Sequence, residues 1–202
     1  MGSDPVVTTV ARKELRLFFA SPVAWLFLAS FAAANGFIVF WVESFFARNI
    51  ADIRPLFEWM PVLLIFLCAA LTMRAWSEER SRGTIEHILT QPHSPWPFVA
   101  GKFCACFTLL GLAVVLTLPL PFTVALIANL DWGPVLGGYA ATLMLGGMYL
   151  TIGLYISALS DNSVVSLIAT VMLCSVLYLS GSPDFTAYFS DHTGNMLRML
   201  GS

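Results

Sequence analysis

The sequence predicts an all-α protein, a polytopic bundle of helices that crosses a membrane. Of its 202 residues, 58% are hydrophobic and only 11% are charged, whereas soluble domains average about 45–50% apolar and about 25% charged residues. The apolar residues gather in runs of the length that a membrane-spanning helix needs, about 20 residues. We therefore expect a single transmembrane domain over residues 1–202, with five spans and almost no soluble part.

Residues 6–19 precede the first run and mix apolar side chains with charged ones. This pattern predicts a short amphipathic helix that lies in the membrane interface. Ser21-Pro22 then ends it, because a residue before proline avoids helical geometry and proline suits the first turn of the next helix. The charged residues of the interfacial helix are Arg12, Lys13, Glu14 and Arg16.

The first long apolar run covers residues 22–42. The basic residues before it and Ala32-Ala33-Ala34 within it imitate a signal peptide with its cleavage site. The run continues as far as Trp41, however, and that length crosses a bilayer. We therefore expect a retained spanning helix.

Four further runs complete the bundle, at residues 57–76, 98–128, 135–159 and 164–180. Pro119 and Pro121 interrupt the third span, and they either kink it or mark its outer re-entry; such kinks are tolerated in many membrane helices. Small residues spaced four apart, such as Gly101 with Ala105 and Gly153 with Ser157, predict close helix packing, either inside the bundle or at a dimer seam. The tail, residues 181–202, is expected outside the cytoplasm.

The basic residues predict a cytoplasmic N-terminus, because loops on that side carry most of the lysine and arginine. In this orientation the basic residues on the cytoplasmic side are Arg12, Lys13, Arg16, Arg74, Arg80, Arg82 and Lys102. Those on the outer side are Arg48, Arg54 and Arg198. Lys102 is expected at interface depth, and almost no charged residue is expected within the spans.

Residues 77–97 form the cytoplasmic loop between the second and third spans, and they hold the densest charge in the sequence. Gly83 permits a turn and Thr84 is a good helix N-cap, so a short helix should follow. Its apolar residues share one face, and its polar residues share another. The helix either merely joins two spans or docks onto a cytoplasmic partner. Its apolar residues are Ile85, Ile88 and Leu89, and its polar ones are Glu86 and His87.

This loop resembles that of ABC-2 type permeases, the membrane subunits of certain bacterial ABC transporters. Such permeases carry E-E-R/K, G-T-x-E-x-L-L-T-x-P and G-K runs, which are similar to Met73–Arg80, Gly83–Pro92 and Gly101-Lys102 here. Further matches lie at residues 13–22 and 57–61. Together they resemble the gliding-motility-associated and copper-reductase-maturation branches more than polysaccharide exporters. Members of the family usually have six spans, one more than this sequence offers.

The resemblance implies that residues 84–89 form a coupling helix that contacts a separate ATP-binding subunit. Residues 6–19 would be the connecting helix, which could also touch that subunit, and a second permease chain would complete the translocation path. The residues implied in coupling and docking are Glu78, Glu79, Arg80, Arg82, Gly83, Thr84, Ile85, Glu86, His87, Ile88 and Leu89.

The sequence contains no G-x-x-x-x-G-K-[ST] phosphate loop, so ATP and Mg²⁺ should bind the partner ATPase. We expect no catalytic residue, cofactor, metal or nucleic acid on this chain, and a location in the bacterial inner membrane. An extracytoplasmic accessory subunit is a further possible partner. Two other functions stay open: a membrane-embedded enzyme, and a scaffold or assembly protein that does not transport.

Overall fold

The computed structural model describes residues 4–42, 54–83, 95–127 and 131–181, and its regular elements there are all helices. Five helical stretches in these ranges are long and apolar enough to cross a membrane. They run over Ala24–Trp41, Arg54–Ser81, Trp96–Leu126, Trp132–Leu159 and Ser163–Ser180. The predicted all-α bundle with five spans is therefore confirmed for this part of the chain.

The first two helices meet at a sharp break. Helix α1 covers Asp4–Ala20, and α2 covers Pro22–Phe37 and continues as the π-helical turn η1, Ile38–Val42. The backbone N–H of Ser21 donates to the carbonyl of Phe18 at 3.0 Å, which closes the last turn of α1. Pro22 then begins α2, as its fixed φ and missing N–H predict.

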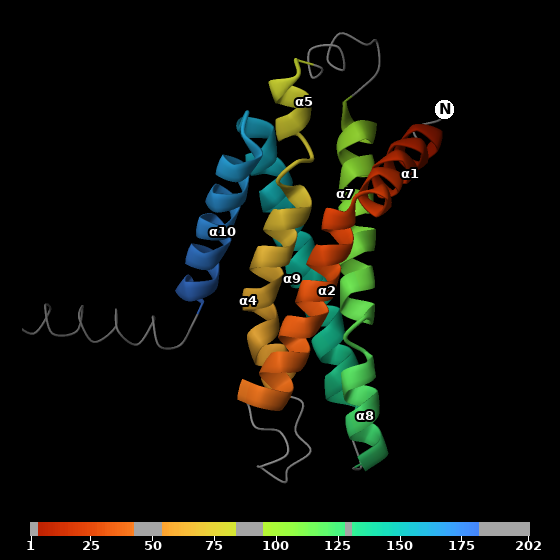
Figure 1. Cartoon of the computed structure of the whole chain (residues 1–202), viewed down its shortest axis with the longest axis vertical. Helices are drawn as coiled ribbons and strands as arrows, with labels where there is room; N and C mark the ends of the chain where they lie inside the picture. Colours follow the sequence, from red (N-terminus) through yellow and green to blue (C-terminus); the bar gives the residue numbers. More distant parts are fainter. Residues whose placement is uncertain (1–3, 43–53, 84–94, 128–130, 182–202) are drawn as a thin grey trace, which may run out of the picture.

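Helix α4, Arg54–Thr72, is the central helix of the bundle, and it packs against α2, α7, α9 and α10. The chain then turns through residues 73–76 into the short helix α5, Ser77–Ser81. Figure 1 shows α5 above the end of α4, at the same end of the bundle as α1 and the start of α7.

The third span is two helices, α7 over Trp96–Val115 and α8 over Pro119–Ile127. Between them the backbone forms turns at residues 116–118, and Pro119 begins the new helix. The Thr117 hydroxyl donates to the carbonyl of Val114 at 2.7 Å and lies 3.1 Å from the Tyr139 hydroxyl. The interruption predicted from the prolines is therefore present, and side-chain hydrogen bonds satisfy part of the opened backbone.

Helices α9, Trp132–Leu159, and α10, Ser163–Ser180, follow with a tight connection between them. Each begins with a side-chain cap: Asp131 accepts from the N–H of Gly133 at 3.0 Å, and Asn162 accepts from that of Val164 at 2.9 Å. Aspartate and asparagine are preferred at this position because their oxygens satisfy otherwise unpaired amide groups.

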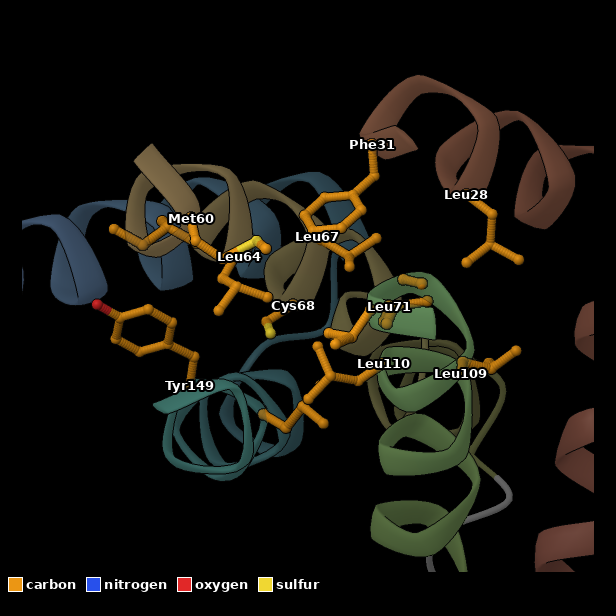
Figure 2. Close-up of a cluster of buried hydrophobic side chains, with 14 of the residues drawn as sticks. Leu28, Phe31, Met60, Leu64, Leu67, Cys68, Leu71, Leu109, Leu110 and Tyr149 are labelled. Atoms are coloured by element: carbon orange, nitrogen blue, oxygen red, sulfur yellow. The ribbon is translucent and has the colours of Figure 1, made fainter. Parts of the chain in front are cut away.

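The hydrophobic core lies where α4 faces α7 and α9 (Figure 2). Met60, Leu64 and Cys68 of α4 are fully buried, and Leu110 of α7 and Tyr149 of α9 pack into the same cluster. Gly146 lets α9 approach α7 closely within this cluster. A Cβ added to Gly146 would lie 2.5 Å from Leu110 Cδ2.

Two of the small-residue positions pack within the chain. A Cβ on Gly101 of α7 would lie 2.7 Å from Val10 Cβ of α1, and one on Gly153 of α9 would lie 2.2 Å from Thr72 Oγ1 of α4. At these two positions, packing inside the bundle therefore accounts for the glycine. Helix α1 consequently packs along α7, with its N-terminal end slanting away from the bundle (Figure 1).

Candidate functional site

The candidate site is the end of the bundle where α1, α5 and the start of α7 come together (Figure 1). Glu78, Glu79, Arg80 and Arg82 lie on or directly after α5, and Gly83 ends the described segment. The remaining predicted coupling residues lie outside the described residues: Thr84, Ile85, Glu86, His87, Ile88 and Leu89.

Ser157 of α9 holds the beginning of α5. Its Oγ accepts hydrogen bonds from the backbone N–H of Trp76 at 3.1 Å and from that of Ser77 at 3.2 Å. The first amide groups of a helix have no partner within the helix, so a hydroxyl from another helix here takes the place of a local cap. The Ser77 hydroxyl donates to the carbonyl of Met73 and is itself buried.

Arg80 ties the same helix to the turn between α9 and α10. Its guanidinium donates to the carbonyl of Ala158 at 2.8 Å and forms an ion pair with Asp161. Ala158 is in the last turn of α9, where carbonyls lack helical partners and a cation is favoured by the helix dipole. Arg80 therefore joins α5 to the bundle, and its predicted contact with a partner stays a prediction.

Lys102 of α7 is the centre of the site. Its side chain is only 4% exposed, and its Nζ donates to Glu14 Oε1 at 3.0 Å, to Glu79 Oε1 at 2.9 Å and to the carbonyl of Ala75 at 2.6 Å. An ammonium has three N–H donors, so these contacts occupy all of them. The Trp76 ring lies 4.8 Å from the same nitrogen and adds a cation–π contact.

We call this group, Lys102 with Glu14, Glu79 and the Ala75 carbonyl, the Lys102 clamp. It joins α1, the turn before α5, α5 itself and α7 through one buried ammonium. Removing one member of a buried ion pair leaves a charge without its partner, which costs about 3–5 kcal/mol. The clamp therefore connects helices that are far apart in sequence.

The structure shows that Lys102 is buried within the bundle, near the start of α7. Its expected place at interface depth stays a prediction. A signal for the burial was present in the sequence. Ala105, Cys106 and Leu109 follow Lys102 at helical spacing, so the four residues share one face of α7. This is the buried face of the helix.

Glu78 lies on the outer side of α5 and contacts two arginines. Arg74 Nε is 3.5 Å from Glu78 Oε1, and an Arg82 guanidinium nitrogen is 3.6 Å from Glu78 Oε2. All three side chains are substantially exposed, and such surface pairs contribute about 0–1 kcal/mol each. These residues are therefore available to other partners.

The turn that leads into residues 84–94 is formed at Gly83, which has a φ of +68°. Side chains other than glycine are disfavoured in this left-handed region, and the turn predicted at Gly83 is present. On α1, Arg12, Lys13 and Arg16 are exposed, whereas Glu14 points inward to Lys102. Helix α1 thus presents a basic outer face and one inward carboxylate.

Comparison with protein families gives a match over residues 8–183, to the ABC-2 family transporter proteins. The match includes most of α1 and all five helical stretches that could cross a membrane. No curated protein and no solved structure matches the chain. This chain is a multi-pass membrane protein that belongs to the ABC-2 transporter family.

Proposed function

We propose that this chain is the permease subunit of an ATP-driven ABC-2 transporter of the bacterial inner membrane. A separate cytoplasmic ATPase would bind ATP and Mg²⁺, and this chain would convert the resulting movement into substrate export or mechanical work. Membership of the ABC-2 transporter family supports the proposal. In such an assembly the chain has no ATPase activity of its own, and a second permease chain completes the path.

The observation that carries the proposal is the Lys102 clamp. Residues 84–94 connect α5 to α7 in the sequence, and the clamp holds both flanks of this segment through Glu79 of α5 and Lys102 of α7. A loop fixed at both ends moves together with its flanks. A partner that moves residues 84–89 would therefore move α7, and α1 with it through Glu14.

A second connection runs through Arg80 to the turn between α9 and α10. Displacement of α5 would therefore reach α9 and α10 as well as α1 and α7. Both connections use buried or multiply bonded cations rather than single exposed ion pairs. This is the arrangement expected of an element that transmits force into a helical bundle.

The positions of the basic residues support a cytoplasmic location for this end. Arg74, Arg80 and Arg82 lie around α5, and the exposed basic residues of α1 lie at the same end (Figure 1). Arg54 begins α4 at the opposite end. An excess of lysine and arginine marks the cytoplasmic side of membrane proteins.

Affinity purification of the tagged chain from native membranes, with mass spectrometry of its partners, tests the proposal. The parent chain should recover a subunit that contains a phosphate-binding loop sequence, and Glu86→Arg should lose it. Glu58→Arg is the matched control, because Glu58 is an exposed glutamate near the other end of α4. Recovery of the subunit with Glu86→Arg would contradict the docking assignment. Its absence with the parent chain would contradict the transporter proposal.

A further inference from the structure

Two hollows adjoin each other along the contact between α2 and α4. The first, of about 330 Å³, lies at the α5 end between α1, α2 and the turn into α5, and Arg74, Glu78 and Arg82 line its charged side. The second, of about 320 Å³, lies between α2, α4 and α10 and is almost wholly apolar. Phe27 and Ala70 line both hollows, so the charged one continues into the apolar one.

The apolar hollow runs along the outer surface of the bundle. Leu63, Phe66 and Leu67 of α4 line it, and Phe66 is 59% exposed. From Leu63 to Ala70 the helix rises roughly 10 Å, at 1.5 Å per residue. The hollow therefore has the length and the chemistry of a channel for part of an extended hydrocarbon chain.

The charged hollow carries an excess of guanidinium groups at its mouth. Arg74 and Arg82 both contact the single carboxylate of Glu78, at 3.5 and 3.6 Å. Among the described residues, Glu78 is the ion-pair partner of each arginine. The other carboxylate in the lining, Glu14, is bound by Lys102. At the mouth itself two guanidiniums share one carboxylate, and the planar fork of arginine matches a phosphate group.

We propose that these two hollows together form a binding site for one phospholipid from the leaflet next to α1 and α5. The phosphate lies at Arg74 and Arg82, and one acyl chain passes Phe27 and Ala70 towards Leu63. A phospholipid has the two chemistries that the site provides, an anionic group at the membrane surface and a hydrocarbon chain inside it. The bound lipid packs between α2 and α4, beside the Lys102 clamp.

Native mass spectrometry of the purified full chain in detergent, titrated with phosphatidylglycerol, tests the site. The parent chain should retain one lipid. Arg74→Gln with Arg82→Gln should bind it at least about tenfold more weakly, because charge-assisted hydrogen bonds to the phosphate are lost. The matched control is Arg12→Gln with Arg16→Gln, two exposed arginines of α1 outside the site, which should keep the parent affinity.

A second pair of variants tests the acyl-chain part. Ala34→Phe, on the lining of the apolar hollow, should weaken binding, whereas Ala33→Phe, exposed on the same helix and outside the lining, should not. Soluble glycerol phosphate should not compete with the lipid.

Four results would overturn the proposal. One is failure of the parent chain to retain a lipid. Another is an equal loss of lipid affinity in the Arg74/Arg82 and Arg12/Arg16 double variants, which would indicate general attraction of the lipid to a basic surface. Competition by glycerol phosphate would indicate an anion site without an acyl chain. Conversion of a dimer to a monomer by Ala34→Phe would place a second copy of this chain in the apolar hollow.

Discussion

Lys102 connects segments of the bundle that are far apart in the sequence. Its ammonium is enclosed and bound by three acceptors from three segments of the chain. Glu14, Ala75 and Glu79 are separated from it by 88, 27 and 23 residues. A helical pattern can show that Lys102 lies on a buried face, but no local pattern identifies its partners.

Replacement of Lys102 by methionine should strongly destabilise the protein. The change keeps much of the volume but leaves the partly buried carboxylates of Glu14 and Glu79 without a cation, so we expect a loss of up to about 3 kcal/mol in the free energy of unfolding. Thermal unfolding in detergent measures this loss. Lys13→Met, at an exposed position of α1, is the control and should have little effect.

The destabilisation caused by Lys102→Met should be partly reversed when the carboxylates of Glu14 and Glu79 are also neutralised. A chain with Lys102→Met, Glu14→Gln and Glu79→Gln has no unpaired buried charge, and replacing a whole buried ionic group is often close to neutral. Equal melting temperatures for the single and triple variants would contradict an ionic role for the clamp.

Gly83 permits a test of the turn that leads into the coupling segment. Its φ of +68° should make Gly83→Ala unfavourable by about 1–2 kcal/mol, whereas asparagine tolerates this conformation better. No atom lies within 4 Å of the added Cβ, so the backbone conformation alone is responsible. We expect Gly83→Ala to reduce recovery of the ATPase subunit more than Gly83→Asn does. Equal recovery with both variants would show that the turn does not position the docking segment.

At the scale of elements, α5 depends on its contacts with other helices. It spans only Ser77–Ser81, and helices shorter than about 12–15 residues are marginal in water by themselves. The hydroxyl of Ser157 and the guanidinium of Arg80 connect it to α9 and to the turn before α10. The position of α5 therefore follows the positions of α9 and of this turn.

Ser157→Ala should loosen α5 while leaving the rest of the bundle folded. The change removes the acceptor for two backbone N–H groups, and loss of a helix cap costs about 0.5–2 kcal/mol. Hydrogen exchange at Trp76 and Ser77 should become faster than in the parent chain. Thr151→Ala, an exposed hydroxyl of the same helix, is the control. Unchanged exchange in Ser157→Ala would contradict the cap.

The approach of α4 and α9 is tested at Gly153. A Cβ there would lie 2.2 Å from Thr72 Oγ1, so Gly153→Ala should destabilise the bundle by about 1–3 kcal/mol. Gly137 of the same helix has nothing within 4 Å of an added Cβ, and Gly137→Ala should instead stabilise by about 0.5–1 kcal/mol through helix propensity. Melting temperatures that fall equally in both variants would contradict the close contact.

The elements were largely predictable from the sequence because their signals are local. Apolar runs of spanning length, Pro22 after α1, the prolines of the third span and Gly83 all act within a few residues. The capping role of Ser157 and the partners of Lys102 were not predictable in the same way. They depend on how α5, α7 and α9 are arranged in three dimensions.

At the scale of the whole molecule, the charged residues that the structure describes are concentrated at one end of an apolar bundle. That end contains α5, the exposed basic face of α1 and the start of α7 (Figure 1). In the proposed orientation it faces the cytoplasm, where the ATPase subunit is available. The family match and the connections from α5 to α1, α7, α9 and the turn before α10 support one account, in which docking at this end moves the bundle.

The most direct test of this account is photo-cross-linking in native membranes from a benzoyl-phenylalanine introduced at Ile85, with the same group at Glu58 as the control for the opposite end. The account predicts a cross-linked ATP-binding subunit from position 85 and none from position 58. No cross-link from position 85, or a cross-link to that subunit from position 58, would contradict the proposed docking site and orientation.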